Sequence, residues 1–144
     1  MGEWSILRCT MKMKRPSLKS QITFLYYRDL ARAARFFEDV LQLELCDDQG
    51  DARIYRVSEK AFVGIVDGAK GHCQAQETNA VLITLVAEHV EDWYAYLKEC
   101  GVKLLTEVKQ PKGFPVKCFF FEDPEGYQYE VQRFLDPKTA HRFQ

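Results

Sequence analysis

Residues 22–45 read ITFLYYRDLARAARFFEDVLQLEL, and residues 82–105 read LITLVAEHVEDWYAYLKECGVKLL. Each stretch opens with a run rich in β-branched, leucine and aromatic residues, which is typical of a strand. A polar corner follows, Arg28-Asp29 in the first stretch and Glu88-His89 in the second, and it leads into apolar residues at helical spacing. The two stretches therefore predict the same strand–corner–helix unit twice.

The two units align at an offset of 60 positions, so that Leu25 corresponds to Leu85. Apolar residues recur at i, i+3, i+4 and i+7 over residues 30–41 and 90–100, which predicts an amphipathic helix in each unit. Asp29 precedes the first helix, where its carboxylate can accept hydrogen bonds from the free amides of the opening turn. This internal similarity indicates a duplicated module.

Further strand-like segments follow each helix. They cover residues 43–46, 52–57 and 61–67 in the first unit, and residues 103–109, 116–121 and 127–134 in the second. The last two are joined by Asp-Pro-Glu-Gly, a tight turn in which proline fixes φ and glycine supplies a positive φ. The sequence therefore predicts an α+β fold of two β-α-β-β-β modules, at about residues 20–67 and 80–135, within one domain over residues 20–137.

The composition is that of an ordinary globular protein, with 47% hydrophobic and 28% charged residues. Its 20 basic and 21 acidic residues argue against nucleic acid as a partner, because such binding needs a basic face. No apolar run approaches the roughly 18 residues of a membrane span, so we expect no membrane partner. Five cysteines without a close pair favour a reduced, cytoplasmic protein. Residues 1–19 are expected to form a loosely ordered leader and residues 138–144 a tail.

Residues 22–45 and the segment FEDPEGYQYEV at residues 121–131 resemble the vicinal oxygen chelate superfamily. That superfamily includes glyoxalase I, extradiol dioxygenases, and the fosfomycin and bleomycin resistance proteins, and the resemblance covers about residues 20–135. It implies an eight-stranded mixed sheet curved into a cup, usually closed over by a symmetric dimer. For the enzymes it also implies a divalent metal at the bottom of the cup.

The resemblance implies four metal ligands on four strands, typically His or Gln, Glu, His and Glu. Their positions fall here on Ile22, Gly64, Leu82 and Glu130. Aliphatic side chains and glycine offer no lone pair, and a divalent cation needs oxygen or imidazole donors. Because only Glu130 can serve as a ligand, we expect no metal cofactor, with a divalent metal kept as the alternative.

Glu130 lies on the last predicted strand, and alternation places Gln128 on the same face. Under the resemblance this face lines the cup. A carboxylate in apolar surroundings suits a general base, which makes Glu130 the candidate catalytic residue. Alternatively, Glu130 orients a ligand or is a relic acid paired with a nearby cation such as Lys117 or Arg56.

The candidate ligand-binding residues are those that strand positions could turn towards the cup. They are Ile22, Phe24, Tyr26, Tyr55, Leu82, Lys117, Phe119, Gln128 and Glu130. An aromatic cup with few polar groups suits a planar or extended organic molecule.

Three functions remain open on this basis. The first is metal-free binding of a small organic ligand, as in the bleomycin-resistance branch. The second is a metal-dependent enzyme of the glyoxalase or dioxygenase type, and the third is a metal-independent catalyst that uses Glu130. An open curved sheet leaves edges and apolar surface uncovered, so the sequence also predicts a homodimer.

Overall fold

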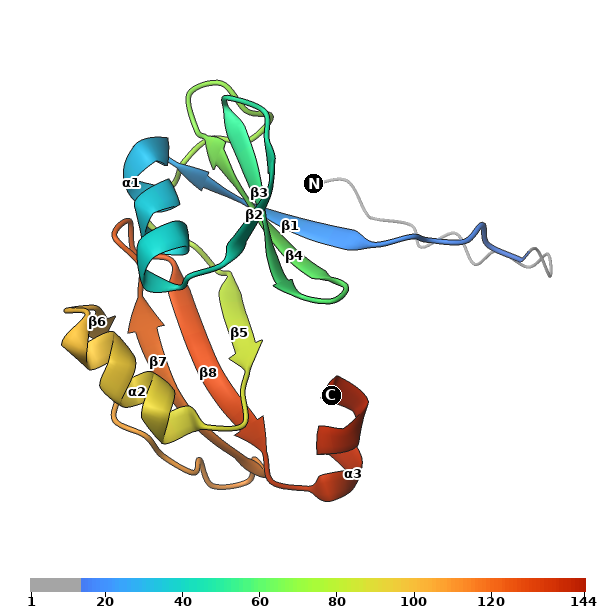
Figure 1. Cartoon of the computed structure of the whole chain (residues 1–144), viewed down its shortest axis with the longest axis vertical. Helices are drawn as coiled ribbons and strands as arrows, with labels where there is room; N and C mark the ends of the chain where they lie inside the picture. The colour runs from blue at the N-terminus through green and yellow to red at the C-terminus, as the bar shows by residue number, and fades with distance from the viewer. Residues whose placement is uncertain (1–13) are drawn as a thin grey trace, which may run out of the picture.

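The computed structural model describes residues 14–144, which form two consecutive modules of strands and helices (Figure 1). The first module contains β1 (Gln21–Tyr27), α1 (Leu30–Arg35), η1 (Phe36–Val40), β2 (Glu44–Asp48), β3 (Ala52–Ser58) and β4 (Ala61–Asp67). The second contains β5 (Leu82–Val86), α2 (Val90–Glu99), β6 (Lys103–Leu104), β7 (Val116–Glu122) and β8 (Gln128–Phe134), and is followed by α3 (Pro137–Ala140) and η2 (His141–Phe143). Residues 1–13 of the predicted leader lie outside the described part of the chain.

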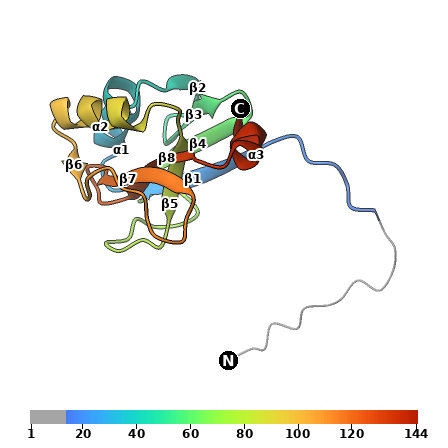
Figure 2. The same cartoon turned by 90° about the horizontal axis from the view of Figure 1, so that it is seen from below.

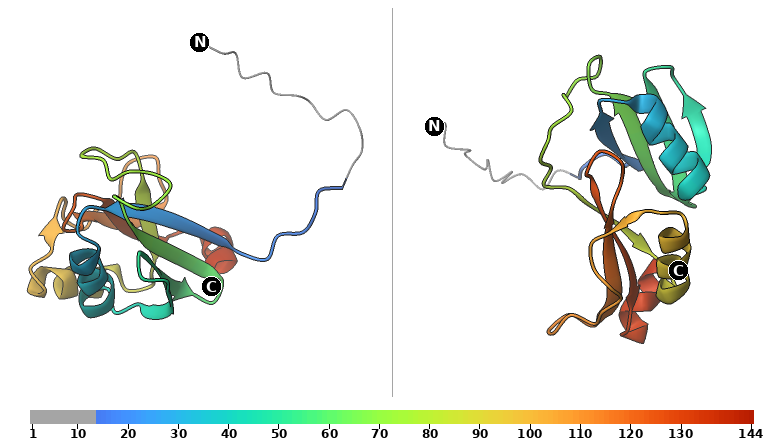
Figure 3. Two further views of the ribbon diagram at one scale, coloured as in Figure 1. Left: turned by 90° about the horizontal axis from the view of Figure 1, so that it is seen from above. Right: turned by 90° about the vertical axis from the view of Figure 1, so that its left-hand side faces the viewer.

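Both modules have the same strand order. The first sheet runs β1-β4-β3-β2 and the second β5-β8-β7-β6, with β1–β4 and β5–β8 parallel and the other pairs antiparallel. This equivalence confirms the predicted α+β fold of two β-α-β-β-β modules. The eight strands of residues 14–144 are divided between two four-stranded mixed sheets. Helices α1 and α2 lie on the same side of the molecule (Figure 2; Figure 3).

The helix ends follow the signals in the sequence. The Asp29 carboxylate accepts a hydrogen bond from the Arg32 amide at 2.9 Å, so it caps α1 as predicted. The chain then winds more widely through η1, where the Leu41 amide donates to the carbonyl of Phe36, five residues earlier. Gly101, with φ at +75°, ends α2 in the left-handed region. No helix within residues 14–144 is long and apolar enough to cross a membrane.

Each sheet has one face against the helices and one face turned away from them. Successive strand residues alternate between the two faces. In β1, Leu25 and Tyr27 are buried against the helices, whereas Phe24 is 39% exposed. In β8, Tyr129 and Val131 are buried in the same way. We call the helix-side face of each sheet the core face and the opposite one the open face.

A buried carboxylate links the two modules through the core. Asp123, in the turn between β7 and β8, is 5% exposed and accepts hydrogen bonds from the hydroxyls of Tyr27 (2.5 Å) and Tyr129 (3.0 Å). It also accepts from the amide of Tyr127 at 3.1 Å. Burial raises the pKa of Tyr27 and Tyr129 far above the ordinary value, so both hydroxyls remain protonated donors at neutral pH.

The same turn also caps the first helix from the other module. The Glu125 carboxylate accepts hydrogen bonds from the amides of Arg28 at 2.7 Å and Asp29 at 2.8 Å, just before α1. Its side chain is 6% exposed, because the start of α1 covers it. The predicted Asp-Pro-Glu-Gly turn therefore joins the modules as well as connecting two strands.

Candidate functional site

Glu130 lies near the middle of the second sheet, on the open face. Thr84 of β5, directly opposite in the register, donates its hydroxyl hydrogen to Glu130 Oε2 at 2.9 Å. On the other side, Phe120 of β7 is the register partner of Glu130. Burial raises the pKa of the neighbouring Cys118 thiol, and the Glu130 carboxylate beside it raises that pKa further, so the thiol stays protonated. The Thr84 hydroxyl thus holds Glu130 in place from β5, with the neutral Cys118 thiol of β7 close by.

Six of the predicted ligand-binding residues lie on the open faces. Ile22, Phe24 and Tyr26 alternate along the open face of β1, and Leu82, Gln128 and Glu130 share the open face of β5 and β8. The apolar members of this set remain accessible: Ile22 is 36%, Phe24 39% and Leu82 47% exposed. These accessible apolar side chains make the open faces the candidate binding surface.

The predictions for Tyr55 and Phe119 are corrected by the structure, which places both on the core face. Tyr55 is fully buried with its ring 5.2 Å from that of Phe37, and Phe119 is fully buried with its ring 5.2 Å from that of Tyr94 on α2. Phe119 pairs with Val131, one residue from Glu130, and therefore points to the opposite side of the sheet. Neither ring is available to a ligand on the open faces.

The two cations expected near Glu130 are engaged elsewhere. Lys117 forms an ion pair with Glu91 of α2, on the helix side of the sheet. Arg56 pairs with Glu44 at 3.0 Å, and its guanidinium lies 5.1 Å from the centre of the Phe62 ring. The expectation that Lys117 or Arg56 neutralises Glu130 is therefore wrong, and so is the placement of Lys117 in the cup.

The residues present do not fit a four-ligand metal site. Of the four positions, Ile22, Gly64 and Leu82 carry no donor atom. The space beside Gly64 is filled as well, because a Cβ atom added there would lie 2.3 Å from Cδ1 of Phe24. Within residues 14–144 there is no group of three or more His, Cys, Asp or Glu side chains arranged to hold a metal ion. Glu130 is the one ligand-type residue among the four.

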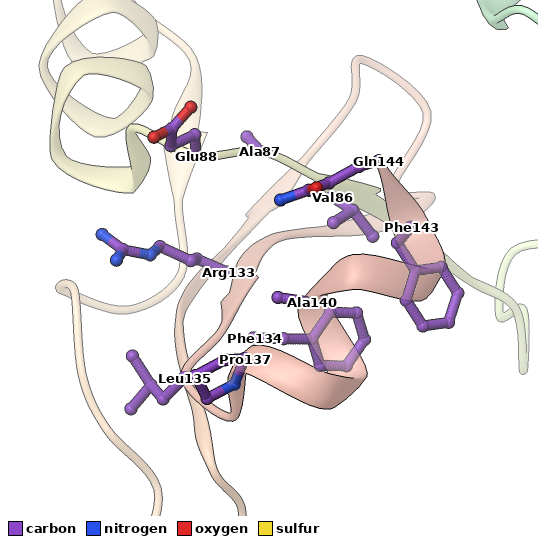
Figure 4. Close-up of a pocket in the computed structure, with 10 residues that line it drawn as sticks. All are labelled: Val86, Ala87, Glu88, Arg133, Phe134, Leu135, Pro137, Ala140, Phe143 and Gln144. Carbon is purple, nitrogen blue, oxygen red and sulfur yellow. The ribbon is translucent and has the colours of Figure 1, made fainter.

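A pocket of about 400 Å³ adjoins the open face of the second sheet (Figure 4). Its apolar walls come from the strand ends and the C-terminal segment: Val86, Phe134, Pro137, Ala140 and Phe143. Ala140 and Phe143 were not predicted as binding residues, because residues 138–144 were expected to form a tail. The available signal was Asp136-Pro137, since an N-cap residue followed by proline favours a helix start. The Asp136 carboxylate does accept from the Thr139 amide and hydroxyl.

The comparisons with known proteins agree with this fold. The sequence model of the glyoxalase/bleomycin resistance protein/dioxygenase superfamily matches residues 20–131. No sequence among the curated proteins matches the chain.

Three solved structures illustrate the likeness. A lactoylglutathione lyase from Agrobacterium tumefaciens is 20% identical with a TM-score of 0.64, over 83% of this chain and 96% of that one. A glyoxalase/bleomycin resistance protein/dioxygenase from Nocardioides is 15% identical with a TM-score of 0.71, over 87% of each chain. The fosfomycin resistance protein FosX from Listeria monocytogenes is 15% identical with a TM-score of 0.65, over 88% of this chain and 99% of that one. At these identities the structures show the fold, and the sequence match shows the family. The chain belongs to the glyoxalase/bleomycin resistance protein/dioxygenase superfamily.

Proposed function

We propose that the protein binds a small organic ligand, aromatic or extended, on its open sheet faces without the four-ligand metal that the superfamily resemblance implies. The observation that carries this proposal is the packing of the Phe24 ring over Gly64. An apolar ring stands where a ligand side chain would have to project, and Ile22 and Leu82 are aliphatic at two further positions. The surface is therefore suited to apolar contact rather than to holding a metal ion.

Apolar burial would supply most of the affinity. Phe24 and Leu82 are 39% and 47% exposed, and covering apolar surface stabilises a complex by about 25 cal/mol per Å². Both belong to strands whose backbone is fixed by parallel pairing, so little ordering is needed when a ligand binds. Pre-formed apolar surfaces of this kind are typical of small-molecule sites.

Glu130 would orient the ligand. Its carboxylate can accept a hydrogen bond from an N–H or O–H group of a bound molecule, and Thr84 fixes its direction. A single anchored polar group on an apolar surface gives orientation and specificity, whereas the surrounding apolar contacts give affinity.

A second copy of the chain would complete the site. Apolar side chains remain exposed on the open faces of both sheets, among them Phe24 and Leu82. Burying such surface between two copies by a twofold arrangement is the commonest solution in soluble proteins. We therefore propose a homodimer in which the open faces are covered jointly.

Metal analysis separates this proposal from an enzyme with a metal centre. After incubation with Zn²⁺, Ni²⁺, Mn²⁺ or Fe²⁺ and removal of the excess, elemental analysis should find much less than one equivalent. A chelator should leave the melting temperature unchanged, because a metal that does not bind adds no stability. Near-stoichiometric metal that is lost in Glu130→Gln, but retained in the exposed control Glu107→Gln, would overturn the proposal in favour of a metalloenzyme.

Ligand binding is tested with the fluorescent probe 8-anilinonaphthalene-1-sulfonate. The folded protein should bind it saturably, and Leu82→Ser should weaken the binding because it removes apolar surface from the open face. Leu45→Ser is the matched control, since Leu45 is 40% exposed but lies on β2 opposite Tyr55, outside the open face. Equal effects of the two substitutions would contradict the open face as the binding surface. Native mass spectrometry of the purified protein would identify a ligand that is carried along.

A further inference from the structure

The pocket beside the C-terminal segment has an apolar end built from two parts of the chain. Phe143 of η2 stacks on Phe134 of β8, with ring centres 4.7 Å apart and an angle of 22° between the planes. Val86, 45% exposed on the open face of β5, and Ala140 of α3 complete this end. Its volume of about 400 Å³ falls within the range of small-molecule sites, roughly 300–1,000 Å³.

The opposite end of the pocket carries one charge of each sign. Glu88 and Arg133 both lie on the left of the close-up, and the Arg133 side chain leaves β8 in the direction opposite to the Phe134 ring, so the pocket lies at the end of the sheet between the two (Figure 4). Neither Glu88 nor Arg133 forms an ion pair with another residue in the described range 14–144. The pocket therefore offers a positive and a negative group to a ligand, and both are unused within this range.

The charge pattern selects among ligands. A purely anionic head group would pair with Arg133 but would be repelled by Glu88. A purely cationic head group would pair with Glu88 but would be repelled by Arg133. A head that carries both charges can pair with both side chains and leaves neither desolvated alone. We propose that this pocket binds a small zwitterion with an aromatic body, of the aromatic α-amino acid class. The body lies against the Phe134–Phe143 end, and the head lies at Glu88 and Arg133.

This inference goes beyond the function proposed above, although the pocket adjoins the same open face. Phe134 is four residues beyond Glu130 along β8, and Glu130 does not line the pocket. A failure at one site can therefore be distinguished from a failure at the other.

The test uses three probes that share the indole ring. L-tryptophan carries both charges, indole-3-propionate lacks the ammonium group and tryptamine lacks the carboxylate. Isothermal titration calorimetry on the full chain should give saturable binding of L-tryptophan, and weaker binding of the other two. Glu130→Gln should leave these affinities unchanged.

Substitutions then assign each group. Arg133→Gln should weaken L-tryptophan about threefold to fivefold, since exposed ion pairs contribute modestly, and should strengthen tryptamine because it removes a like charge. Glu88→Gln should weaken L-tryptophan similarly and should strengthen indole-3-propionate for the same reason. Phe143→Ala should weaken all three about tenfold because it removes apolar contact. Arg35→Gln and Glu99→Gln, both exposed and outside the pocket, are the matched controls.

Three results would overturn the inference. One is the absence of saturable binding of L-tryptophan by a protein that melts cooperatively. Another is binding that Arg133→Gln, Glu88→Gln and Phe143→Ala leave unchanged. The third is loss of binding in Glu130→Gln, which would assign the probe to the open face around Glu130 instead.

Discussion

At the scale of single residues, Asp123 and Glu130 are two carboxylates seven positions apart with different surroundings. Asp123 lies in the core and accepts hydrogen bonds from two tyrosine hydroxyls, whereas Glu130 lies on the open face beside Thr84. The core carboxylate joins the modules, whereas the open-face carboxylate is the one that the proposed function assigns to a ligand. Burial and partners, rather than residue type, divide the two roles.

Asp123 should make stability depend on pH. Burial raises its pKa above the ordinary value near 3.8, although the Tyr27 hydrogen bond opposes the shift. Because the pKa of Asp123 is higher in the folded than in the unfolded state, its contribution to the free energy of unfolding is fully present below pH 3.8. This contribution is lost as the pH rises through the raised pKa. The variant Asp123→Asn lacks this ionisation, so its free energy of unfolding relative to the wild type should rise from pH 4 to pH 7.

Urea unfolding at several pH values measures this difference. Asp39→Asn, at an exposed position of η1, is the control and should run parallel to the wild type. An Asp123→Asn curve that also runs parallel to the wild type over this range would contradict a raised pKa for Asp123.

Gly64→Ala tests the packing over the first sheet. The added Cβ would lie 2.3 Å from Cδ1 of Phe24, so the ring must move from its place on the open face. Overpacking of this kind costs about 1–3 kcal/mol. Denaturant unfolding should show this loss of stability when Gly64→Ala is made in the wild type. When Gly64→Ala is added to the Phe24→Ala variant, it should cause little further loss, because the ring that it clashes with is already absent. Additive losses in the double variant would show that the ring does not occupy this space.

At the scale of the elements, the turn of one module fixes the first helix of the other. Glu125→Ala removes the acceptor for the amides of Arg28 and Asp29, which should cost about 0.5–2 kcal/mol because these amides lose a side-chain cap at the start of α1. Glu125→Gln, which keeps one acceptor oxygen, should lose less. Thermal unfolding provides the measurement, with Glu59→Ala in the β3–β4 turn of the first module as control. An equal loss in Glu59→Ala would show that the cap contributes nothing specific.

At the scale of the whole molecule, the homodimer is the prediction to test. Light scattering coupled to gel filtration should give twice the chain mass at micromolar concentration, because the apolar open faces gain by burial. Phe24→Glu should shift the mass to that of one chain, since a charge on this face opposes its burial. Lys98→Glu, on the exposed side of α2, should leave the dimer intact. A single-chain mass for the wild type would refute the dimer.

The repeat and its local signals were readable from the sequence alone. The strand and helix patterns within each repeated unit, the Asp29 cap and the turn around Pro124 depend on neighbours within a few positions, where periodicity and backbone preference act directly. The same holds for the face of Glu130, because alternation along one strand relates it to Gln128. These features were sufficient to predict the fold class and to place Glu130 and Gln128 on the same face of the second sheet.

Tertiary structure decided the rest, because it depends on contacts between distant segments. Phe119 and Tyr55 are aromatic residues on strands, and this residue type is compatible with either face of a sheet. The strand register places both on the core face, towards the helices. Asp123 meets Tyr27 across 96 positions, and Phe143 stacks on Phe134 only because α3 turns the chain back onto the second sheet. The sequence thus determined the modules and the chemistry available in each, whereas the packing between segments determined which side chains remain accessible on the open faces. Long-range contacts leave no periodic signal in the chain.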